Sequence, residues 1–119
     1  MPRMLIVDDE RDICELLKDF FQEKGFAVLS AFSGEEAIAK LDEQEADVML
    51  LDILLPGLSG IEVLKRIKEH HPKVRVIMVT AIDQVELRCQ AQQYGAVAYV
   101  TKPFDFSRET WSAAFEAAR

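Results

Sequence analysis

Five short segments of the chain are almost continuously apolar and rich in β-branched residues. They cover residues 3–7, 26–31, 47–51, 74–79 and 96–100. Strands that helices cover on both faces have this pattern, whereas strands with one face in water alternate between apolar and polar residues. The pattern therefore predicts five buried strands of a parallel sheet.

Between these segments, apolar residues recur at helical spacing. The apolar face of the first predicted helix consists of Ile13, Leu16, Leu17, Phe20 and Phe21. This helix is expected to end near Gly25, since glycine is common just after a helix. Ser33 with Glu36, and Ser59 with Glu62, have the spacing of a capping box. These pairs predict the starts of the second and third helices.

Two more helices complete the alternation, one over residues 83–94 and one that begins near residue 107. Five strand–helix units in succession predict one domain over residues 1–119. Because parallel crossovers are right-handed, the chain must wind one way and then reverse for helices to cover both faces. We expect an α/β fold, a doubly wound (βα)5 parallel sheet with the flavodoxin-like strand order 2-1-3-4-5.

Polar residues collect where the predicted strands end. These residues are Asp8 and Asp9 after the first strand, Asp52 after the third, Thr80 at the end of the fourth and Lys102 after the fifth. In the order 2-1-3-4-5 these strand ends meet at one edge of the sheet, where such folds bind ligands. Carboxylates crowded together raise one another's pKa, and a hard divalent cation relieves the repulsion. The sequence therefore predicts a Mg²⁺ site built from Asp8, Asp9 and Asp52.

The same residues suit phosphoryl transfer. An aspartate beside Mg²⁺ can act as a nucleophile and form an acyl phosphate. The charge that develops on the phosphoryl oxygens is stabilised by a metal, a cation and a hydroxyl donor. Lys102 and Thr80 are the cation and the hydroxyl donor in this arrangement.

Composition narrows the classes of partner. Of the 119 residues, 50% are hydrophobic and 29% are charged, and the formal net charge is −7. Direct nucleic acid binding is not expected, because it requires clustered Lys and Arg. No apolar run approaches the ~20 residues of a membrane span, and residues 2–3 do not begin a signal peptide. Cys14 and Cys89 stand far apart in helical patterns, as is usual for free thiols in a reducing compartment. We expect a cytoplasmic protein.

Four motifs resemble those of the receiver domains of bacterial two-component response regulators. They are LIVDDE at residues 5–10, LLDILLPGLSG at 50–60, VIMVTA at 76–81 and YVTKPF at 99–104. The resemblance covers essentially the whole chain. It implies a phosphorylation-activated signalling switch rather than a turnover enzyme. Asp52 would accept a phosphoryl group from a histidine kinase or a phosphotransfer protein, with Mg²⁺ as cofactor.

The resemblance also implies roles for individual residues. Mg²⁺ would be held by Asp8, Asp9, Asp52 and the backbone carbonyl of Leu54. Lys102 would contact the phosphoryl oxygens. Thr80 and the aromatic residue Tyr99 would form the switch that changes partner binding. Glu10 and Asp12, in contrast, are expected to face water.

Partner contacts are implied beside the site. They would be made by Ile13 and Leu17 of the first helix and by Pro56 and Pro103 near the strand ends. An output domain or a separate downstream protein would receive the signal. The bond between Lys102 and Pro103 resembles the family's cis bond, which turns the lysine towards the site, although only ~5% of such bonds are cis in folded proteins.

Simpler interpretations of single residues remain open. Asp8 and Asp9 would also suit the start of a helix, where acids interact favourably with the helix dipole. Asp52 can cap the turn before Pro56, and Tyr99 can serve only to pack the sheet. Thr80 and Lys102 can be a plain strand-end hydroxyl and a solvated lysine. His70 and His71, before Pro72, are interpreted as a solvated helix terminus.

Two other function classes are weighed against the signalling switch. A degenerate receiver would bind proteins without phosphoryl transfer, and the complete set of strand-end residues argues against it. A phosphatase of the haloacid type has an aspartate nucleophile and a second Asp two residues later. Here Glu10 and Leu54 occupy the positions two residues after Asp8 and Asp52, so that class is disfavoured.

Overall fold

The computed structural model describes residues 1–119 as five strands and five helices in alternation. The strands are β1 (Arg3–Val7), β2 (Ala27–Ala31), β3 (Val48–Leu51), β4 (Arg75–Thr80) and β5 (Ala96–Thr101). The helices are α1 (Arg11–Glu23), α2 (Gly34–Glu43), α3 (Gly60–His70), α4 (Val85–Gln93) and α5 (Ser112–Ala117).

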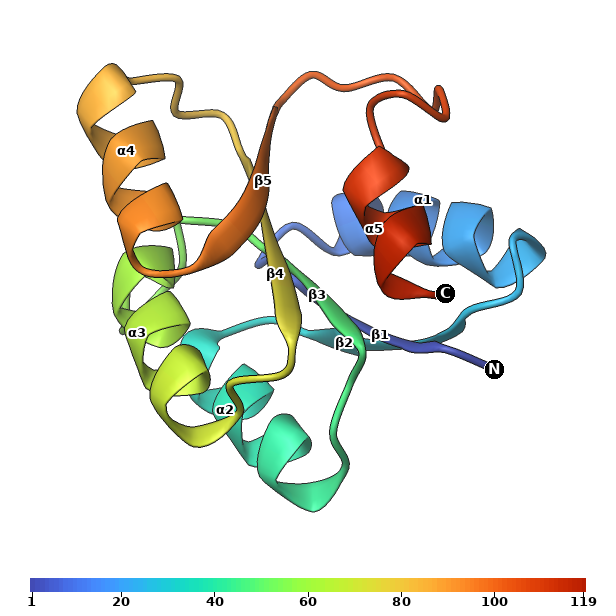
Figure 1. Ribbon diagram of the computed structural model, residues 1–119, viewed down its shortest axis with the longest axis horizontal. Helices are drawn as coiled ribbons and strands as arrows, with labels where there is room; N and C mark the ends of the chain where they lie inside the picture. The colour runs from blue at the N-terminus through green and yellow to red at the C-terminus, as the bar shows by residue number, and fades with distance from the viewer.

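All strands pair in parallel, in the order β2-β1-β3-β4-β5 (Figure 1). The predicted fold class and strand order are therefore confirmed. The register aligns Val7 with Leu51 and Leu51 with Met78. Because these strands end almost level with one another, the residues that follow them come out at one edge of the sheet.

Two layers of helices cover the two faces of the sheet. Helices α1 and α5 lie on one face, and α2, α3 and α4 lie on the other (Figure 1). Each face has its own hydrophobic core, one of 14 buried residues under α1 and α5 and one of 16 under the other three helices. Alternate strand residues point to opposite faces, so each strand contributes to both cores. This explains why the strands are almost continuously apolar.

Two helix starts follow the predicted capping pattern. The hydroxyl of Ser33 accepts a hydrogen bond from the backbone N–H of Glu36, and the hydroxyl of Ser59 accepts one from Glu62. Each bond satisfies one of the N–H groups that the first turn of a helix leaves free. Ser59 thereby fixes the beginning of α3 directly after the loop that follows β3.

The last helix begins later than predicted, at Ser112 rather than near residue 107. The reason is a local network of side-chain hydrogen bonds. A carboxylate oxygen of Asp105 accepts bonds from the backbone N–H of Ser107 and the hydroxyl of Thr110, and the Trp111 indole donates to the Asp105 carbonyl. Asp, Ser and Thr side chains compete in this way with helical backbone bonds.

Two predictions of exposure were wrong. Leu16 was placed on the buried face of the first helix, but it is 53% exposed. His71 was interpreted as solvated, but it is 8% exposed. Its Nε2 atom lies 2.9 Å from Asp42 Oδ1, and its Nδ1 atom lies 3.4 Å from Glu45 Oε1. Both hydrogen-bond partners belong to the end of α2 or directly follow it. Burial alone would lower the pKa of His71, but these two carboxylates outweigh burial and raise it.

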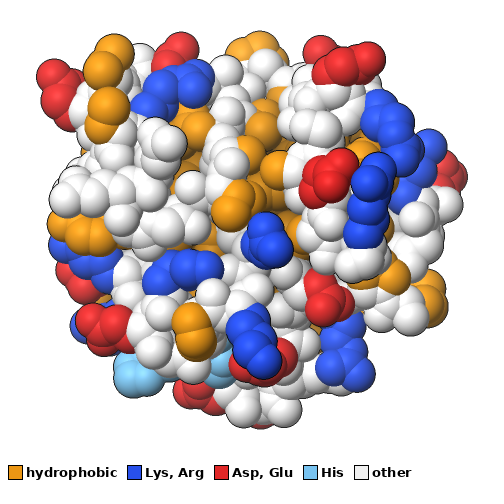
Figure 2. All heavy atoms as spheres, viewed as in Figure 1, with side chains coloured by type: hydrophobic (Ala, Val, Ile, Leu, Met, Phe, Trp, Pro, Cys, Tyr) orange, Lys and Arg blue, Asp and Glu red, His pale blue; other side chains and the backbone are white.

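Charged side chains of both signs surround the hydrophobic atoms in the middle of the face shown in Figure 2, where β4 and β5 lie in Figure 1.

None of the five helices is long and apolar enough to cross a membrane.

Candidate functional site

Backbone hydrogen bonds continue past the strand ends and fix the residues that follow. The N–H of Asp8 donates to the Ala31 carbonyl, and the N–H of Asp52 donates to the Val7 carbonyl at 3.0 Å. On the other side of the sheet, the N–H of Lys102 donates to the Thr80 carbonyl at 2.9 Å. The backbone of Asp8, Asp52 and Lys102 therefore continues the hydrogen bonding of the sheet, which fixes the positions of these residues.

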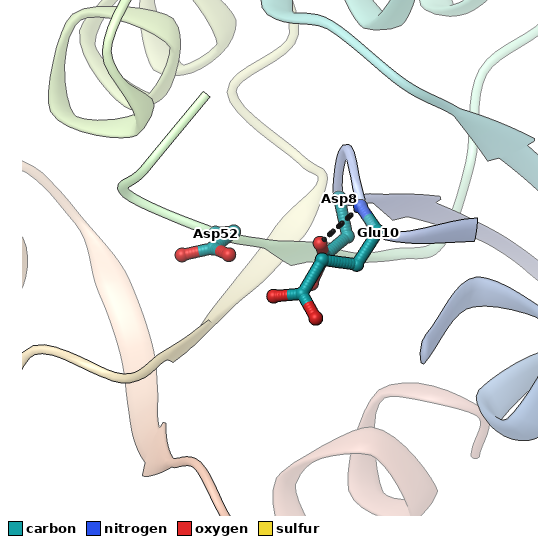
Figure 3. A group of neighbouring side chains, drawn as sticks. All are labelled: Asp8, Glu10 and Asp52. Atoms are coloured by element: carbon teal, nitrogen blue, oxygen red, sulfur yellow. Dashed lines mark hydrogen bonds between the residues drawn. The ribbon is translucent and has the colours of Figure 1, made fainter. Parts of the chain in front are cut away.

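Three carboxylates converge at this edge, from Asp8, Glu10 and Asp52 (Figure 3). One oxygen of each lies within 4.8 Å of one oxygen of the other two. Asp8 and Asp52 are buried, at 2% and 3% exposed, whereas Glu10 lies at the surface. The backbone N–H of Glu10 donates to Asp8 Oδ1 at 2.9 Å, which fixes that carboxylate (Figure 3). Asp9 is exposed and lies outside this group of three.

Lys102 is the cation of the site. Its Nζ atom lies 2.7 Å from Asp8 Oδ2, 2.9 Å from Asp52 Oδ2 and 3.4 Å from Glu10 Oε1. The side chain is only 11% exposed. Burial alone would lower the pKa of Lys102, but the hydrogen bonds with the carboxylates of Asp8 and Asp52 raise it. Lys102 therefore stays protonated and presents a fixed positive charge beside Asp52.

The pKa of Asp8 is set mainly by burial of its carboxylate. Burial raises the pKa of Asp8 above its usual value, even though the hydrogen bonds from Lys102 and from the Glu10 N–H lower it. The neighbouring Asp52 carboxylate also raises this pKa. With three carboxylates against one ammonium group, the site keeps an excess of negative charge, which a further cation would relieve.

The donor atoms fit Mg²⁺. This ion prefers carboxylate and carbonyl oxygens and keeps several water molecules. Asp8 and Asp52 supply two buried carboxylates at the correct edge, and Glu10 adds one that solvent reaches. The sequence interpretation missed Glu10, since an exposed acid at the start of a helix gives no periodic signal. The only available cue was its place two residues after Asp8.

A chain of contacts connects Thr80 with Tyr99. Thr80 is fully buried at the end of β4, and its hydroxyl oxygen lies 3.4 Å from the backbone N–H of Ile82, which donates to it. The hydroxyl of Tyr99 donates to the carbonyl of the same Ile82 at 2.6 Å. Burial raises the pKa of Tyr99, so the phenol remains a donor at neutral pH. Both predicted switch residues therefore contact the backbone of the β4–α4 loop.

The carboxylate of Asp52 is oriented from two sides. Its Oδ1 atom accepts a hydrogen bond from the backbone N–H of Leu54 at 3.1 Å, and its Oδ2 atom accepts one from Lys102. The side chain of Leu54 is 55% exposed and carries no polar group. The Lys102–Pro103 bond is cis, as predicted.

Three of the four residues predicted to contact a partner reach the surface. Pro56 and Pro103 are exposed, and Ile13 is half-buried. Leu17, in contrast, is only 1% exposed and belongs to the core between α1 and the sheet. It has no surface to offer a partner, whereas its neighbour Leu16 does.

One family model matches most of the chain. The model of the response regulator receiver domain matches residues 4–110. The chain belongs to this family. It is a receiver domain of a two-component system, as the sequence motifs predicted.

Named relatives agree with this assignment. The receiver domain is 36% identical over 103 residues to sporulation initiation phosphotransferase F of Bacillus subtilis, covering 87% of this chain and 83% of the relative. It is 37% identical over 102 residues to the alkaline phosphatase synthesis transcriptional regulatory protein PhoP of the same organism. That match covers 86% of this chain and 42% of PhoP. The chain therefore spans less than half the length of transcriptional regulators such as PhoP.

A solved structure also resembles the receiver domain closely. It is a chain in the crystal structure of the CheX–CheY–BeF3–Mg²⁺ complex from Borrelia burgdorferi. The two chains superimpose with a TM-score of 0.91 and share 30% of their residues, over 99% of this chain and 90% of the other.

Proposed function

We propose that this receiver domain is a phosphorylation-activated switch that accepts a phosphoryl group on Asp52. A carboxylate oxygen of Asp52 attacks the phosphorus of a phosphohistidine on a histidine kinase or a phosphotransfer protein. The phosphorus–nitrogen bond breaks, and the released imidazole takes up a proton. The observation that carries the proposal is the buried Asp52 carboxylate, held by Lys102 on one side and by the Leu54 N–H on the other.

The position of Asp52 suits a nucleophile. Hydrogen bonds to both oxygens fix the plane of the carboxylate, so little orientational freedom is lost when the donor arrives. At 3% exposure, the side chain is also screened from bulk water. Asp52 is the one buried acid at the end of β3, the strand between β1 and β4.

Mg²⁺ binding is assigned to Asp8, Asp52 and the backbone carbonyl of Leu54, with Asp9 on the exposed side. Glu10 joins this set because its carboxylate meets those of Asp8 and Asp52. The chemistry that the bound ion supplies is neutralisation of charge on the phosphoryl oxygens. Three carboxylates face a single ammonium group at the site, and this excess of negative charge supports the assignment.

Lys102 and Thr80 stabilise the product. Lys102 already lies 2.9 Å from Asp52 Oδ2, so its ammonium group is placed to contact a phosphoryl oxygen without a large movement. Thr80 would turn its hydroxyl towards another phosphoryl oxygen. Because the Thr80 hydroxyl now accepts the Ile82 N–H, that movement would change the β4–α4 loop and with it the hydrogen bond to Tyr99.

The proposed output is a change of partner binding and not a turnover reaction. Residues 1–119 would act as one cytoplasmic receiver domain that catalyses its own phosphorylation and dephosphorylation. The kinase or phosphotransfer protein would contact Ile13, Leu16, Pro56 and Pro103 around the site. An output domain or a separate protein would respond to the change near Tyr99.

The test is intact-protein mass spectrometry after incubation with acetyl phosphate and Mg²⁺. We expect the mass of one added phosphoryl group in the parent protein, and no addition when the metal is chelated or in the variant Asp52→Asn. Asp19→Asn is the matched control, because Asp19 is an exposed acid on α1. Undiminished labelling of Asp52→Asn would show that the acceptor is another residue.

A further inference from the structure

Two hollows adjoin at the amino ends of the strands, the edge of the sheet opposite Asp52. The first, here called the apolar hollow, lies between β1, β2 and the end of α2 and has a volume of about 150 Å³. The second, the cationic hollow, has a volume of about 530 Å³ and is lined by residues at the starts of β1 and β4. Arg3, Glu45 and Ala46 line both hollows, and no residue of the proposed phosphorylation site lines either.

The walls of the apolar hollow come from the sheet and from α2. Leu5 of β1 pairs with Leu29 of β2, so both side chains point to the same face of the sheet. Leu5 shares a hydrophobic core with Leu41 of α2, which places α2 over that face. Leu5 and Leu41 are buried, whereas Leu29 is 48% exposed. Helix α2 therefore leaves part of the edge strand β2 uncovered, and seven of the 11 residues around the opening are hydrophobic.

The cationic hollow carries three positive side chains, those of Arg3, Lys73 and Arg75. None of them makes an ion pair. The two acids of the hollow, Asp47 and Glu45, have other hydrogen-bond partners, a backbone N–H and a histidine ring. Three cations thus face two carboxylates here, although the whole chain has a formal net charge of −7. An anion would find free donors at this place.

Arg3 stands where the two hollows meet. It lies two residues before Leu5, and its register partner Ala27 lies two residues before Leu29. Side chains two residues apart on a strand share a face, so the side chain of Arg3 follows those of Leu5 and Leu29 along the same face. Its guanidinium group has the planar, forked geometry that binds both oxygens of a carboxylate. An apolar wall is therefore continued directly by a carboxylate-binding group.

From this arrangement we propose that the two hollows together bind a small carboxylate with an unbranched apolar chain of about six carbons. An apolar cavity of about 150 Å³ accommodates a molecule of the size of benzene, which sets the length of the chain. The chain lies between Leu5, Leu29 and Leu41, and the carboxylate lies on Arg3. The site is separate from Asp52 and does not depend on the function proposed for that residue.

The experiment titrates hexanoate into the isotope-labelled receiver domain at neutral pH while backbone amide NMR signals report binding. Acetate carries the charge without the chain, and 1-hexanol carries the chain without the charge. Each CH₂ group that leaves water raises the affinity about fourfold. We expect hexanoate to bind at least about tenfold more tightly than acetate or 1-hexanol, and to shift the signals of residues 27–29 and 44–46.

Two variants test the two parts of the site. Ala46→Leu places a larger side chain where the hollows meet, so hexanoate binding should weaken at least about tenfold. Ala39→Leu is its control, because Ala39 is an exposed alanine of α2 that lines neither hollow. Arg3→Gln removes the charge and should weaken hexanoate binding about tenfold while the affinity for 1-hexanol stays the same. Arg66→Gln, at an exposed arginine of α3 that lines neither hollow, should bind like the parent.

Equal affinities of the parent for hexanoate, acetate and 1-hexanol would overturn the proposal, as would unchanged hexanoate binding in Arg3→Gln. The Arg3→Gln comparison decides on its own where Ala46→Leu does not fold, because the backbone bonds of Arg3 are kept in that variant. A second measurement is the midpoint of urea unfolding, since a ligand that binds only the folded state stabilises it. Hexanoate should raise this midpoint in the parent and in Arg66→Gln more than in Arg3→Gln. The same increase in all three proteins would contradict a carboxylate site at Arg3.

Discussion

Gly60, the first residue of α3, lies so close to the backbone of Asp52 and Ile53, at the proposed phosphorylation site, that no side chain fits there. A Cβ atom at this position would be 2.0 Å from the carbonyl oxygen of Asp52 and 2.6 Å from the Cα atom of Ile53. The N–H of Gly60 also donates to the Ile53 carbonyl at 2.8 Å. In the variant Gly60→Ala, the start of α3 and the segment after β3 must therefore separate by about 1 Å or more.

The cost of this separation can be estimated. Forcing an extra carbon into a packed site costs ~1–3 kcal/mol. Loss of the hydrogen bond between Gly60 and Ile53 adds about 1 kcal/mol. The higher helix propensity of alanine returns ~1 kcal/mol. We therefore expect Gly60→Ala to lower the free energy of unfolding by about 2 kcal/mol, which an ordinary domain stability of ~5–15 kcal/mol tolerates.

Urea unfolding measures the stability, and the rate of labelling by acetyl phosphate measures the site. Because Asp52 is displaced relative to Lys102, labelling should slow by at least about tenfold, since a misplacement of ~1 Å at a reacting group costs up to ~100-fold. Ser59→Ala is the control at the same helix start. Loss of its cap should cost ~1 kcal/mol while labelling keeps its rate. A Gly60→Ala protein that is as stable and as quickly labelled as the parent would refute the reasoning.

Three further predictions concern the lifetime of the acyl phosphate, the pH dependence of folding stability and the surface that contacts the phosphoryl donor. The side chain of Leu54 has no polar group to orient the water that hydrolyses the acyl phosphate. Leu54→Asn should therefore speed phosphate loss about tenfold, which is the effect of one oriented hydrogen bond. Equal acyl-phosphate half-lives in the two proteins would contradict this. The pKa of His71 is raised in the folded state by Asp42 and Glu45, so its contribution to stability is present below pH ~6.5 and is lost as the pH rises through the folded pKa. Urea unfolding of parent and His71→Gln should therefore differ most at low pH, and a difference that grows with pH would reverse the expected sign. Ile13→Ala should weaken transfer from phosphohistidine and spare labelling by acetyl phosphate, whereas equal loss with both donors would make Ile13 a core residue.

The features that the sequence predicts correctly are those that depend on backbone pattern. Continuous apolar segments identify buried strands, and the right-handed crossover rule limits their order, of which 2-1-3-4-5 is a common solution. Once the order is fixed, Asp8, Asp52 and Lys102 must meet at one edge, because each directly follows a strand that ends there. Their contacts, at 2.7 and 2.9 Å to Lys102, follow from the topology and not from any local motif.

The features that escaped prediction depend on side chains that meet only in the folded chain. His71 is buried because Asp42 and Glu45, at the end of another helix, partner it. Glu10 faces water as predicted, with its side chain 62% exposed, but its contact with Lys102 was not predicted. Nothing in the spacing of Leu16 and Leu17 tells which of the two points into the core.

The contacts of Arg88 with the Tyr99 ring and with Asp83 could likewise not be predicted from the sequence. Tyr99 is on β5 and Asp83 is in the loop after β4, so neither periodicity nor a motif relates them to Arg88. Sequence interpretation placed Thr80 and Tyr99 in the switch through family resemblance. Only the structure shows that the backbone of Ile82 connects these two residues and that Arg88 contacts the ring of Tyr99.

The most direct test of the phosphoacceptor is reductive trapping of the acyl phosphate. The receiver domain is labelled with acetyl phosphate and Mg²⁺ and treated with borohydride, which reduces an aspartyl phosphate to homoserine. Tandem mass spectrometry then locates the modified residue. We expect homoserine at position 52 alone, in a yield that falls to zero without Mg²⁺. Homoserine at position 8 or 9, or none at position 52 in protein that carries a phosphoryl group, would contradict the assignment of Asp52 as the phosphoacceptor.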